Sequence, residues 1–247
     1  MTTDRLGWRR KFAVLIPSTN TIVQPEFDDM RPKGVTNHIS RVFVPDIKLS
    51  TDADMANFMA LIENGTRDAL NAALTCQPDQ IIIGMSSETF WGGLEGSRKL
   101  AAQLAEWTDL PITMGSDAAD AALKAFDARR LGILSPYLPI GDANVERFFT
   151  DLGYDIARII GLKRTSPTDI ANTSLEDIDA ALNELGALDI DAILQCGTNL
   201  CMAHHASTAS ERIGKPVIAI NTALYWHALR TSGINDTRDE FGGLFQK

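Results

Sequence analysis

The chain has 247 residues, of which 45% are apolar, and its 32 acidic against 23 basic residues give a formal charge of −9 at pH 7. That length suits one large domain or two domains of about 100–150 residues each. The acidic balance disfavours nucleic acid and anionic membranes as partners. No stretch approaches the roughly 18–20 apolar residues of a spanning helix, and the N-terminus lacks an apolar signal core. We therefore expect a cytoplasmic protein that binds neither nucleic acid nor membranes.

The cysteines and histidines give no sign of a disulfide or metal site. Cys76, Cys196 and Cys201 are an odd number of cysteines, which argues against a disulfide framework, and their spacing fits no zinc pattern. The neighbours His204 and His205 rarely share one ion, because adjacent residues on a helix point about 100° apart. We expect neither a metal nor disulfides.

Strand-like apolar runs alternate with helix-like runs along the chain, which is typical of an α/β protein with a mostly parallel sheet covered by helices. Strands are expected at residues 11–16, 39–45, 80–84, 111–115, 130–135, 156–161, 192–196 and 216–220. Helices are expected at residues 51–76, 96–106, 116–126, 141–152, 174–185, 203–213 and 222–231.

The two halves of the chain resemble each other. Three strand segments of the first half, residues 11–18, 79–85 and 111–116, match residues 130–137, 191–197 and 216–221 of the second. Such a repeat predicts two similar α/β lobes whose strand ends face a common cleft. We expect residues 1–117 and 225–247 to form the first lobe and residues 118–224 the second. The acidic tail, residues 235–247, is expected to pack back on the first lobe.

Cys196 is the leading candidate for chemistry. It ends a short apolar run, and the sequence after it is compatible with a helix, so the thiol is expected at the carboxyl end of a strand, where ligands of open α/β sheets bind. Gly197 lets the backbone approach a ligand, and Thr198 and Asn199 add polar groups. Free N–H groups at a helix start favour an anion and a thiolate. The alternative is a small buried core residue.

Polar residues follow the other predicted strands. The loop of Pro17, Ser18, Thr19 and Asn20 offers donors for a carboxylate, and the same residue types are good helix N-caps, which is compatible with that role. It lacks the glycines and lysine of a phosphate-binding loop.

A second loop, residues 84–89, places Ser86 and Ser87 where they can donate to an oxyanion. Glu88 fits either a charge at a helix N-terminus, which we favour, or a general base. Tyr137 ends a further strand, so its phenol is a candidate donor or an ordinary half-buried side chain.

These motifs together resemble the aspartate/glutamate racemase superfamily, in the branch of arylmalonate decarboxylases and maleate cis-trans isomerases. The resemblance covers nearly the whole chain and rests on residues 17–20, 84–87, 135–137, 194–197 and 242–245. It implies two Rossmann-like lobes related by pseudo-symmetry, no cofactor, and a small carboxylate substrate in the cleft.

The resemblance also bears on the number of thiols. Racemases and isomerases of the superfamily carry a cysteine at both equivalent strand ends, whereas its decarboxylases keep only the one that matches Cys196. Gly84 stands at the other position here, which is decarboxylase-like. Asn20 is closer to the isomerases, in which an asparagine binds a substrate carboxylate. Met85 replaces a hydroxyl that the decarboxylases carry next to the serine matched by Ser86.

We therefore expect a cofactor-free decarboxylase of malonate-like diacids. In it Ser86, Ser87, Tyr137 and the N–H groups of Cys196 and Gly197 would hold the enediolate, and the Cys196 thiol would protonate it. Two enzymatic alternatives remain, a maleate cis-trans isomerase, which needs a thiolate nucleophile, and a racemase of a dicarboxylate or amino acid. A third possibility is a non-catalytic carboxylate-binding protein. The sequence leaves a homo-oligomer open.

Overall fold

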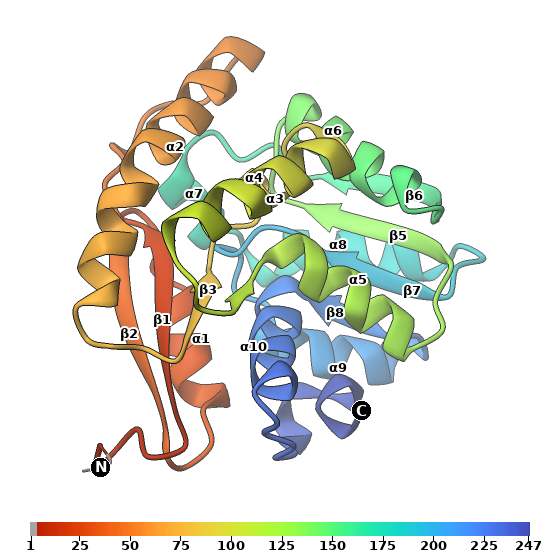
Figure 1. The fold of residues 1–247 in the computed structure, drawn as a ribbon. Coiled ribbons are helices and arrows are strands. Elements are labelled where there is room, and N and C mark those ends of the chain that lie inside the picture. Colours follow the sequence, from red (N-terminus) through yellow and green to blue (C-terminus); the bar gives the residue numbers. More distant parts are fainter. Residues whose placement is uncertain (1–3) are drawn as a thin grey trace.

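Two parallel four-stranded sheets form the framework of the protein in the computed structural model, which describes residues 4–247 (Figure 1). The first sheet has the order β2-β1-β3-β4 and the second the order β6-β5-β7-β8. All strand pairs are parallel. The strands are β1 (Arg10–Pro17), β2 (Val35–Val42), β3 (Gln80–Ile83), β4 (Ile112–Thr113), β5 (Arg130–Ser135), β6 (Asp155–Gly161), β7 (Ala192–Gln195) and β8 (Val217–Ala219).

Helices cover both sheets. They are α1 (Val23–Met30), α2 (Asp52–Leu74), α3 (Ser87–Phe90), α4 (Gly93–Trp107), α5 (Gly115–Ala125), α6 (Pro139–Asp151), α7 (Pro167–Ala171), α8 (Leu175–Gly186), α9 (Ala203–Ile213) and α10 (Ile220–Thr231). Two short 3₁₀ turns, Asp239–Phe241 and Gly243–Gln246, close the chain. Among residues 4–247, no helix combines the length and apolarity needed to cross a membrane.

The two sheets pack against each other through a shared hydrophobic core. Phe12, Val14 and Ile16 of β1 face the same buried cluster as Leu131 and Ile133 of β5, so the inner faces of the sheets share one core. The alternate residues of β1 pack outward against α2 and α4, and those of β5 and β7 pack outward against α8 and α9. Strands buried on both faces need such continuous apolar runs.

Equivalent backbone hydrogen bonds follow strand β3 in the first sheet and strand β7 in the second. The N–H of Gly84, just after β3, donates to Leu15 O of β1 at 2.8 Å. The N–H of Cys196, just after β7, donates to Leu134 O of β5 at 2.8 Å. The predicted repeat is therefore confirmed, and Gly84 and Cys196 occupy equivalent positions.

Helices α5 and α10 lie side by side between the sheets, and α10 also contacts α1 and β4 of the first half (Figure 1). The lobe limits expected at 117/118 and 224/225 fall inside these two helices. The limits stay a prediction, since the shared core joins both halves.

Several expected elements shift. Strand β2 begins four residues before the expected 39–45 segment and ends before Phe43, because Val35 pairs with Arg10 at the start of β1. The ranges of α1, α3 and α7 are not among the expected helices, since each is eight residues or shorter and carries little periodic signal. The favoured interpretation of Glu88 as a residue at a helix N-terminus agrees with its place in the first turn of α3.

The tail contacts both halves rather than the first alone. Asp236 pairs with Arg9 of the first lobe, while Phe241, Leu244 and Phe245 enter the shared core. The first of these 3₁₀ turns packs on α9.

Candidate active site

A small cavity of about 60 Å³ lies where the carboxyl ends of β1, β3, β5 and β7 meet. The structure brings most of the predicted site residues to it, since its walls include Pro17, Asn20, Met85, Ser86, Ser87, Tyr137, Gly197, Thr198 and Asn199. This is the edge at which parallel α/β sheets bind ligands.

Ser86 links the two lobes at the centre of the cavity. Its Oγ accepts hydrogen bonds from the backbone N–H groups of Gly197 and Thr198, both at 3.2 Å. It also lies 2.8 Å from the Tyr137 hydroxyl. With two N–H groups on its lone pairs, the Ser86 hydroxyl is left to donate to the Tyr137 oxygen, which leaves the Tyr137 proton for a bound group. The Gly197 N–H, expected to hold an oxyanion, donates to Ser86 Oγ instead, so that expectation is wrong and a ligand carboxylate here meets the Tyr137 hydroxyl.

Gly197 is required by the shape of this turn. Its φ is +101°, a conformation that strains residues with a Cβ. A Cβ at this position would also lie 2.4 Å from Pro136 Cγ. The backbone N–H of Gly197 therefore reaches Ser86 only because no side chain stands in the way.

Asn20 serves as the helix cap that one sequence interpretation predicts, and its role in carboxylate binding stays a prediction. Its Oδ1 accepts from the N–H groups of Ile22 and Val23, at 3.0 and 2.9 Å, and so caps the start of α1. Its Nδ2 then points across the cleft to Thr198 Oγ1 at 3.4 Å. The amide is thereby oriented with its donor toward the cavity, as carboxylate binding needs. Asn199 reinforces this contact by accepting from the N–H of Thr21.

Cys196 lies behind the cavity wall and is fully buried in the shared core. Burial raises the pKa of its thiol far above the ordinary value, and the nearby Asp142 carboxylate raises it further. The resting thiol is therefore neutral. Its backbone N–H is used by Leu134 O, so the expectation that this N–H holds an oxyanion is wrong.

Helix α9 spans the expected residues 203–213, so its start lies seven residues beyond Cys196. The expectation of free helix N–H groups beside the thiol is wrong, because the N–H groups at this start are already occupied. Glu26 of α1, itself buried, accepts from the N–H groups of Met202 and Ala203 at 2.9 Å each. The first N–H groups of α9 are thus occupied by an acidic side chain of the other lobe and do not favour a thiolate at Cys196.

Two other predicted residues serve the framework. The Ser18 hydroxyl donates to Val44 O and accepts from Val44 N–H, both at 3.0 Å, and so fastens the segment after β2. Gly84 does not line the cavity either. A Cβ at Gly84 would lie 2.8 Å from Ile16 Cγ2 and 3.2 Å from Val23 Cγ1, so the place of a second thiol is already filled.

Sequence reasoning missed the only cationic side chain among the lining residues, Arg164. It follows the edge strand β6, its guanidinium pairs with Asp177 at 2.7 Å, and its Nε is buried without a partner. The rule that ligands bind beyond the carboxyl ends of strands extends to β6 and points to this loop. The apolar side of the cavity, formed by Leu49, Met55 and Phe58, was missed too.

Two acidic groups near the cavity carry raised pKa values. Burial raises the pKa of Glu88, in the first turn of α3, to about 7, while the Ser87 hydroxyl donates to its Oε2 at 3.0 Å. Burial raises the pKa of Asp142 to about 6, opposed by the hydrogen bond from Ser135. Both groups titrate near neutral pH, as groups at functional sites often do.

The fold and the cavity define a two-lobed α/β protein with hydroxyl and amide groups at the carboxyl ends of its strands and a buried thiol in the residue before the lining Gly197. The family model described as arylmalonate decarboxylase matches residues 53–245, and the chain belongs to this family. The arylmalonate decarboxylase of Bordetella bronchiseptica is 26% identical over 168 residues, which cover 66% of this chain and 69% of that protein. The resemblance drawn from the sequence motifs is thereby confirmed.

Solved structures share the architecture over 96% of this chain. A cysteine-to-serine mutant of the maleate cis-trans isomerase of Nocardia farcinica, with a covalently bound succinylcysteine intermediate, has a TM-score of 0.87 at 19% identity, with 99% of that chain covered. The maleate isomerase of Pseudomonas putida has a TM-score of 0.85 at 17% identity, with 98% covered. An arylmalonate decarboxylase has a TM-score of 0.73 at 18% identity, with 99% covered. These likenesses confirm the predicted fold, and the named relatives are enzymes.

Proposed function

We propose that this protein is a cofactor-independent decarboxylase of malonate-like dicarboxylic acids, with Cys196 as its proton donor. One carboxylate of the diacid leaves as CO₂ when its carbon–carbon bond breaks, and the electron pair passes into the remaining carboxyl group as an enediolate. The donors around Ser86 and Tyr137 stabilise that charge as it develops. The S–H of Cys196 then gives its proton to the carbanion carbon, and water returns a proton to the thiolate.

Two features of the structure support the proposal. The thiol of Cys196 is neutral, and the equivalent position in the first half of the chain, Gly84, has no space for a second thiol. Burial and the nearby Asp142 carboxylate raise the pKa of Cys196, so the group starts as an acid. Gly84 has no side chain, and Ile16 and Val23 fill the space where one would stand. One acid on one face suits one-sided protonation, whereas racemisation needs an acid and a base on opposite faces.

The apolar side of the cavity supports the departure of CO₂. Leu49, Met55 and Phe58 form a wall that offers no hydrogen bond from its side chains, so a carboxylate held against it is desolvated. Loss of its charge as neutral CO₂ relieves that cost. The other carboxylate would be held by polar groups of the same cavity, the Tyr137 hydroxyl and the Asn20 amide.

A maleate cis-trans isomerase is the second candidate, favoured by the orientation of the Asn20 amide and by the likeness to the Nocardia isomerase. That neighbour carries a succinylcysteine intermediate, which requires a cysteine that attacks carbon as a thiolate. The raised pKa of Cys196 weighs against this chemistry here.

Incubation of the purified protein in D₂O with phenylmalonate, methylmalonate, maleate and aspartate, followed by NMR, tests the proposal. Loss of CO₂ with one deuterium placed at the α-carbon is the expected result. Conversion of maleate to fumarate without decarboxylation would transfer the assignment to the isomerase. Binding of these acids without any turnover would support the non-catalytic carboxylate-binding alternative.

A further inference from the structure

Among the described residues that line the cleft cavity, Arg164 is the one with a cationic side chain, and it carries an unused donor. Its backbone N–H donates to Pro136 O at 2.9 Å, next to Tyr137. Its Nη2 pairs with Asp177 at 2.7 Å, whereas its Nε–H is buried and has no partner within residues 4–247. Buried donors normally find an acceptor, so an unpaired one in a cavity wall points to a ligand that supplies the acceptor.

Arg158, six residues earlier, shows how an arginine with a framework role is placed in the same segment. It pairs with Glu184 of α8 at 2.5 Å, just as Arg164 pairs with Asp177 of α8. The Arg158 side chain is 54% exposed and that of Arg164 only 21%, and Arg158 is absent from the described residues that line the cavity. Exposed ion pairs contribute little to stability, so the pairing with α8 does not account for the burial of Arg164.

The charge of a bound diacid also requires a cation. A dicarboxylate brings two negative charges into the cleft, and burial of an unpaired charge is costly. The Tyr137 hydroxyl and the Asn20 amide, which line the same cavity, are neutral. Among the described residues, the charge of Arg164 is paired with Asp177 alone, which is itself half exposed. Arg164 therefore keeps positive charge available for a ligand.

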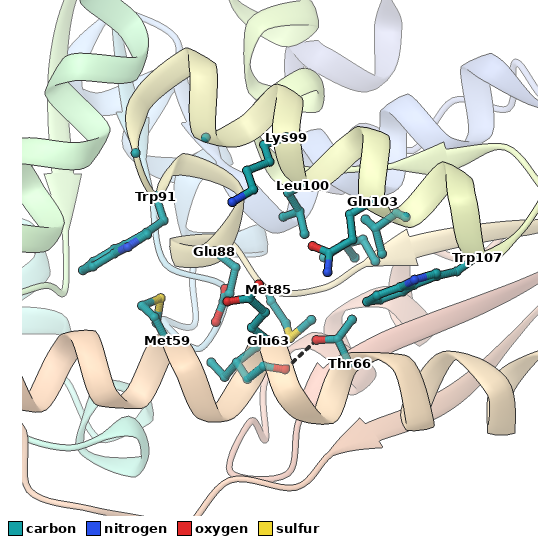
Figure 2. Close-up of a pocket in the computed structure, with 15 residues that line it drawn as sticks. Met59, Glu63, Thr66, Met85, Glu88, Trp91, Lys99, Leu100, Gln103 and Trp107 are labelled. Carbon is teal, nitrogen blue, oxygen red and sulfur yellow. Dashed lines mark hydrogen bonds between the residues drawn. The ribbon is translucent and has the colours of Figure 1, made fainter.

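Glu88, the one acidic side chain among the described lining residues, does not neutralise Arg164. It also lines a separate cavity of about 250 Å³ between α2 and α4, in which Figure 2 shows it between Trp91 and Met85. Its Oε2 accepts from the Ser87 hydroxyl at 3.0 Å.

We infer that the Arg164 guanidinium binds the carboxylate that stays on the substrate, together with the Tyr137 hydroxyl. The inference rests on the proposed function for the reaction and adds a residue that recognises the acid. The loop is fixed against both walls, because Lys163 N–H donates to Tyr137 O at 3.2 Å and Leu49 N–H donates to Thr165 O at 2.6 Å. A cation here favours the retained carboxyl group, whose charge grows as the enediolate forms, whereas a bond to the departing carboxylate would oppose its loss as neutral CO₂.

The binding test uses calorimetric titration in a Cys196→Ala background, which prevents turnover. The probes are methylmalonate, its monomethyl ester, which keeps one carboxylate, and its dimethyl ester, which keeps none. Arg164→Gln removes the cation and Arg164→Lys retains it. Arg164→Met, which keeps the aliphatic stem, replaces the glutamine variant if that variant folds poorly. Arg158→Gln is the matched control, because it breaks the other ion pair with α8.

Arg164→Gln is expected to weaken the binding of methylmalonate and of the monoester by at least about tenfold each, because a charge-assisted hydrogen bond is lost. Arg164→Lys should lose less, the dimethyl ester should respond to neither variant, and Arg158→Gln should change nothing. Unchanged affinity in Arg164→Gln, an equal loss in Arg158→Gln, or failure of methylmalonate to bind would overturn the inference. So would a loss confined to methylmalonate, because Arg164 would then hold the second carboxylate.

Decarboxylation is assayed separately with Cys196 intact. Arg164→Gln should lower kcat by about 10²–10³-fold, as the loss of a donor to a developing oxyanion does. A higher kcat would show that Arg164 restrains the departing carboxylate, and the inference would fail. If binding depends on Arg164 but no CO₂ is released, the carboxylate site stands and the decarboxylase assignment fails. If CO₂ release and affinity are the same in Arg164→Gln, the site fails and the proposed function stands.

Discussion

The two equivalent strand ends, at Gly84 and Cys196, share a backbone and differ in everything around it. Each N–H donates to a leucine carbonyl of the neighbouring strand at 2.8 Å. Beside Gly84 stands Ile16, whose methyl group fills the space of a side chain. Beside Cys196, the residue equivalent to Ile16 is Ser135, which bonds to Asp142. One end of the repeat is therefore closed with apolar atoms, and the other holds a thiol next to titratable groups.

This difference shows how two lobes with the same backbone can place an acidic group on only one side of a bound substrate. The residues that follow Pro17 and Pro136 differ in a similar way. Ser18 bonds to the segment after β2, whereas Tyr137, its counterpart in the second half, reaches the cavity. The second lobe supplies the acid, and the first lobe supplies Ser86 and Asn20 across the cleft.

Removal of the thiol should have the largest effect. Cys196→Ala is expected to lower kcat for malonate decarboxylation by about 10²–10⁴-fold, the range of a general acid. Initial rates of CO₂ release measure it. Cys76→Ala is the matched control, because the Cys76 thiol only donates to Ala73 O, away from the cleft. An unchanged rate in Cys196→Ala would remove both cysteine mechanisms at once.

Tyr137→Phe should follow in size. It removes the donor whose proton is left for the developing enediolate, which typically costs about 10²–10³-fold in kcat. KM should change little, since the bond strengthens mainly in the transition state. Tyr154→Phe is the control, because its hydroxyl bonds to Asp120 outside the cleft. A rise in KM with kcat intact would instead make Tyr137 a substrate-binding residue.

A cysteine introduced at position 84 should lower the free energy of unfolding, because its side chain has no space there. Gly84→Cys places a Cβ 2.8 Å from Ile16 Cγ2, and overpacking of this kind costs about 1–3 kcal/mol of the free energy of unfolding. Urea denaturation measures the loss. Gly243→Cys is the control, since a Cβ there meets its nearest atom at 3.6 Å.

The double variant Gly84→Cys, Ile16→Ala sharpens this comparison. It should be more stable than the sum of the single losses predicts, because the second change removes the crowding methyl group. If the losses of unfolding free energy in the two single variants simply add in the double variant, Ile16 does not crowd a side chain at position 84. If the double variant racemises an α-arylpropionate, the lack of space for a thiol at position 84 is what limits this protein to protonation on one face of the substrate.

The sequence predicted the parts of this site that depend on strand ends. Cys196, Ser86 and Tyr137 each directly follow or end an apolar run, so their meeting at one sheet edge follows from a parallel α/β fold. The carboxylate of Glu26 lies 176 residues from the Met202 N–H that it accepts, and no local pattern announces such a pairing. The neutral state of Cys196 likewise depends on burial by both lobes, which periodicity does not reveal.

Two further features, Arg164 and the cavity between α2 and α4, could not be predicted from the sequence either. The segment after β6 has no apolar period, so the place of Arg164 emerges only when β6 pairs with β5. The cavity depends on the spacing between two helices that are 18 residues apart in the chain, from the end of α2 at Leu74 to the start of α4 at Gly93. Trp91, in the turn between α3 and α4, lines this cavity.

The smallest expected effect is a pH dependence set by Glu88. Its pKa is raised from 4.5 to about 7 in the folded protein, so its carboxyl is protonated in the fold where it would be ionised in the unfolded chain. That contribution to stability is fully present below about pH 4.5 and is lost as pH rises through about 7. The free energy of unfolding should therefore fall across this window.

Glu88→Gln is expected to remove that fall, and urea denaturation at pH 5 and pH 8 measures it. The same ionisation places a negative charge beside the cavity, so KM for a dianionic malonate should rise above pH 7 in the unmodified protein and stay flat in Glu88→Gln. Glu106→Gln, on the exposed side of α4, is the control. If KM rises equally in both variants, a group other than Glu88 controls substrate entry, and Asp142, whose pKa is raised to about 6 on the thiol side, becomes the next carboxyl to test.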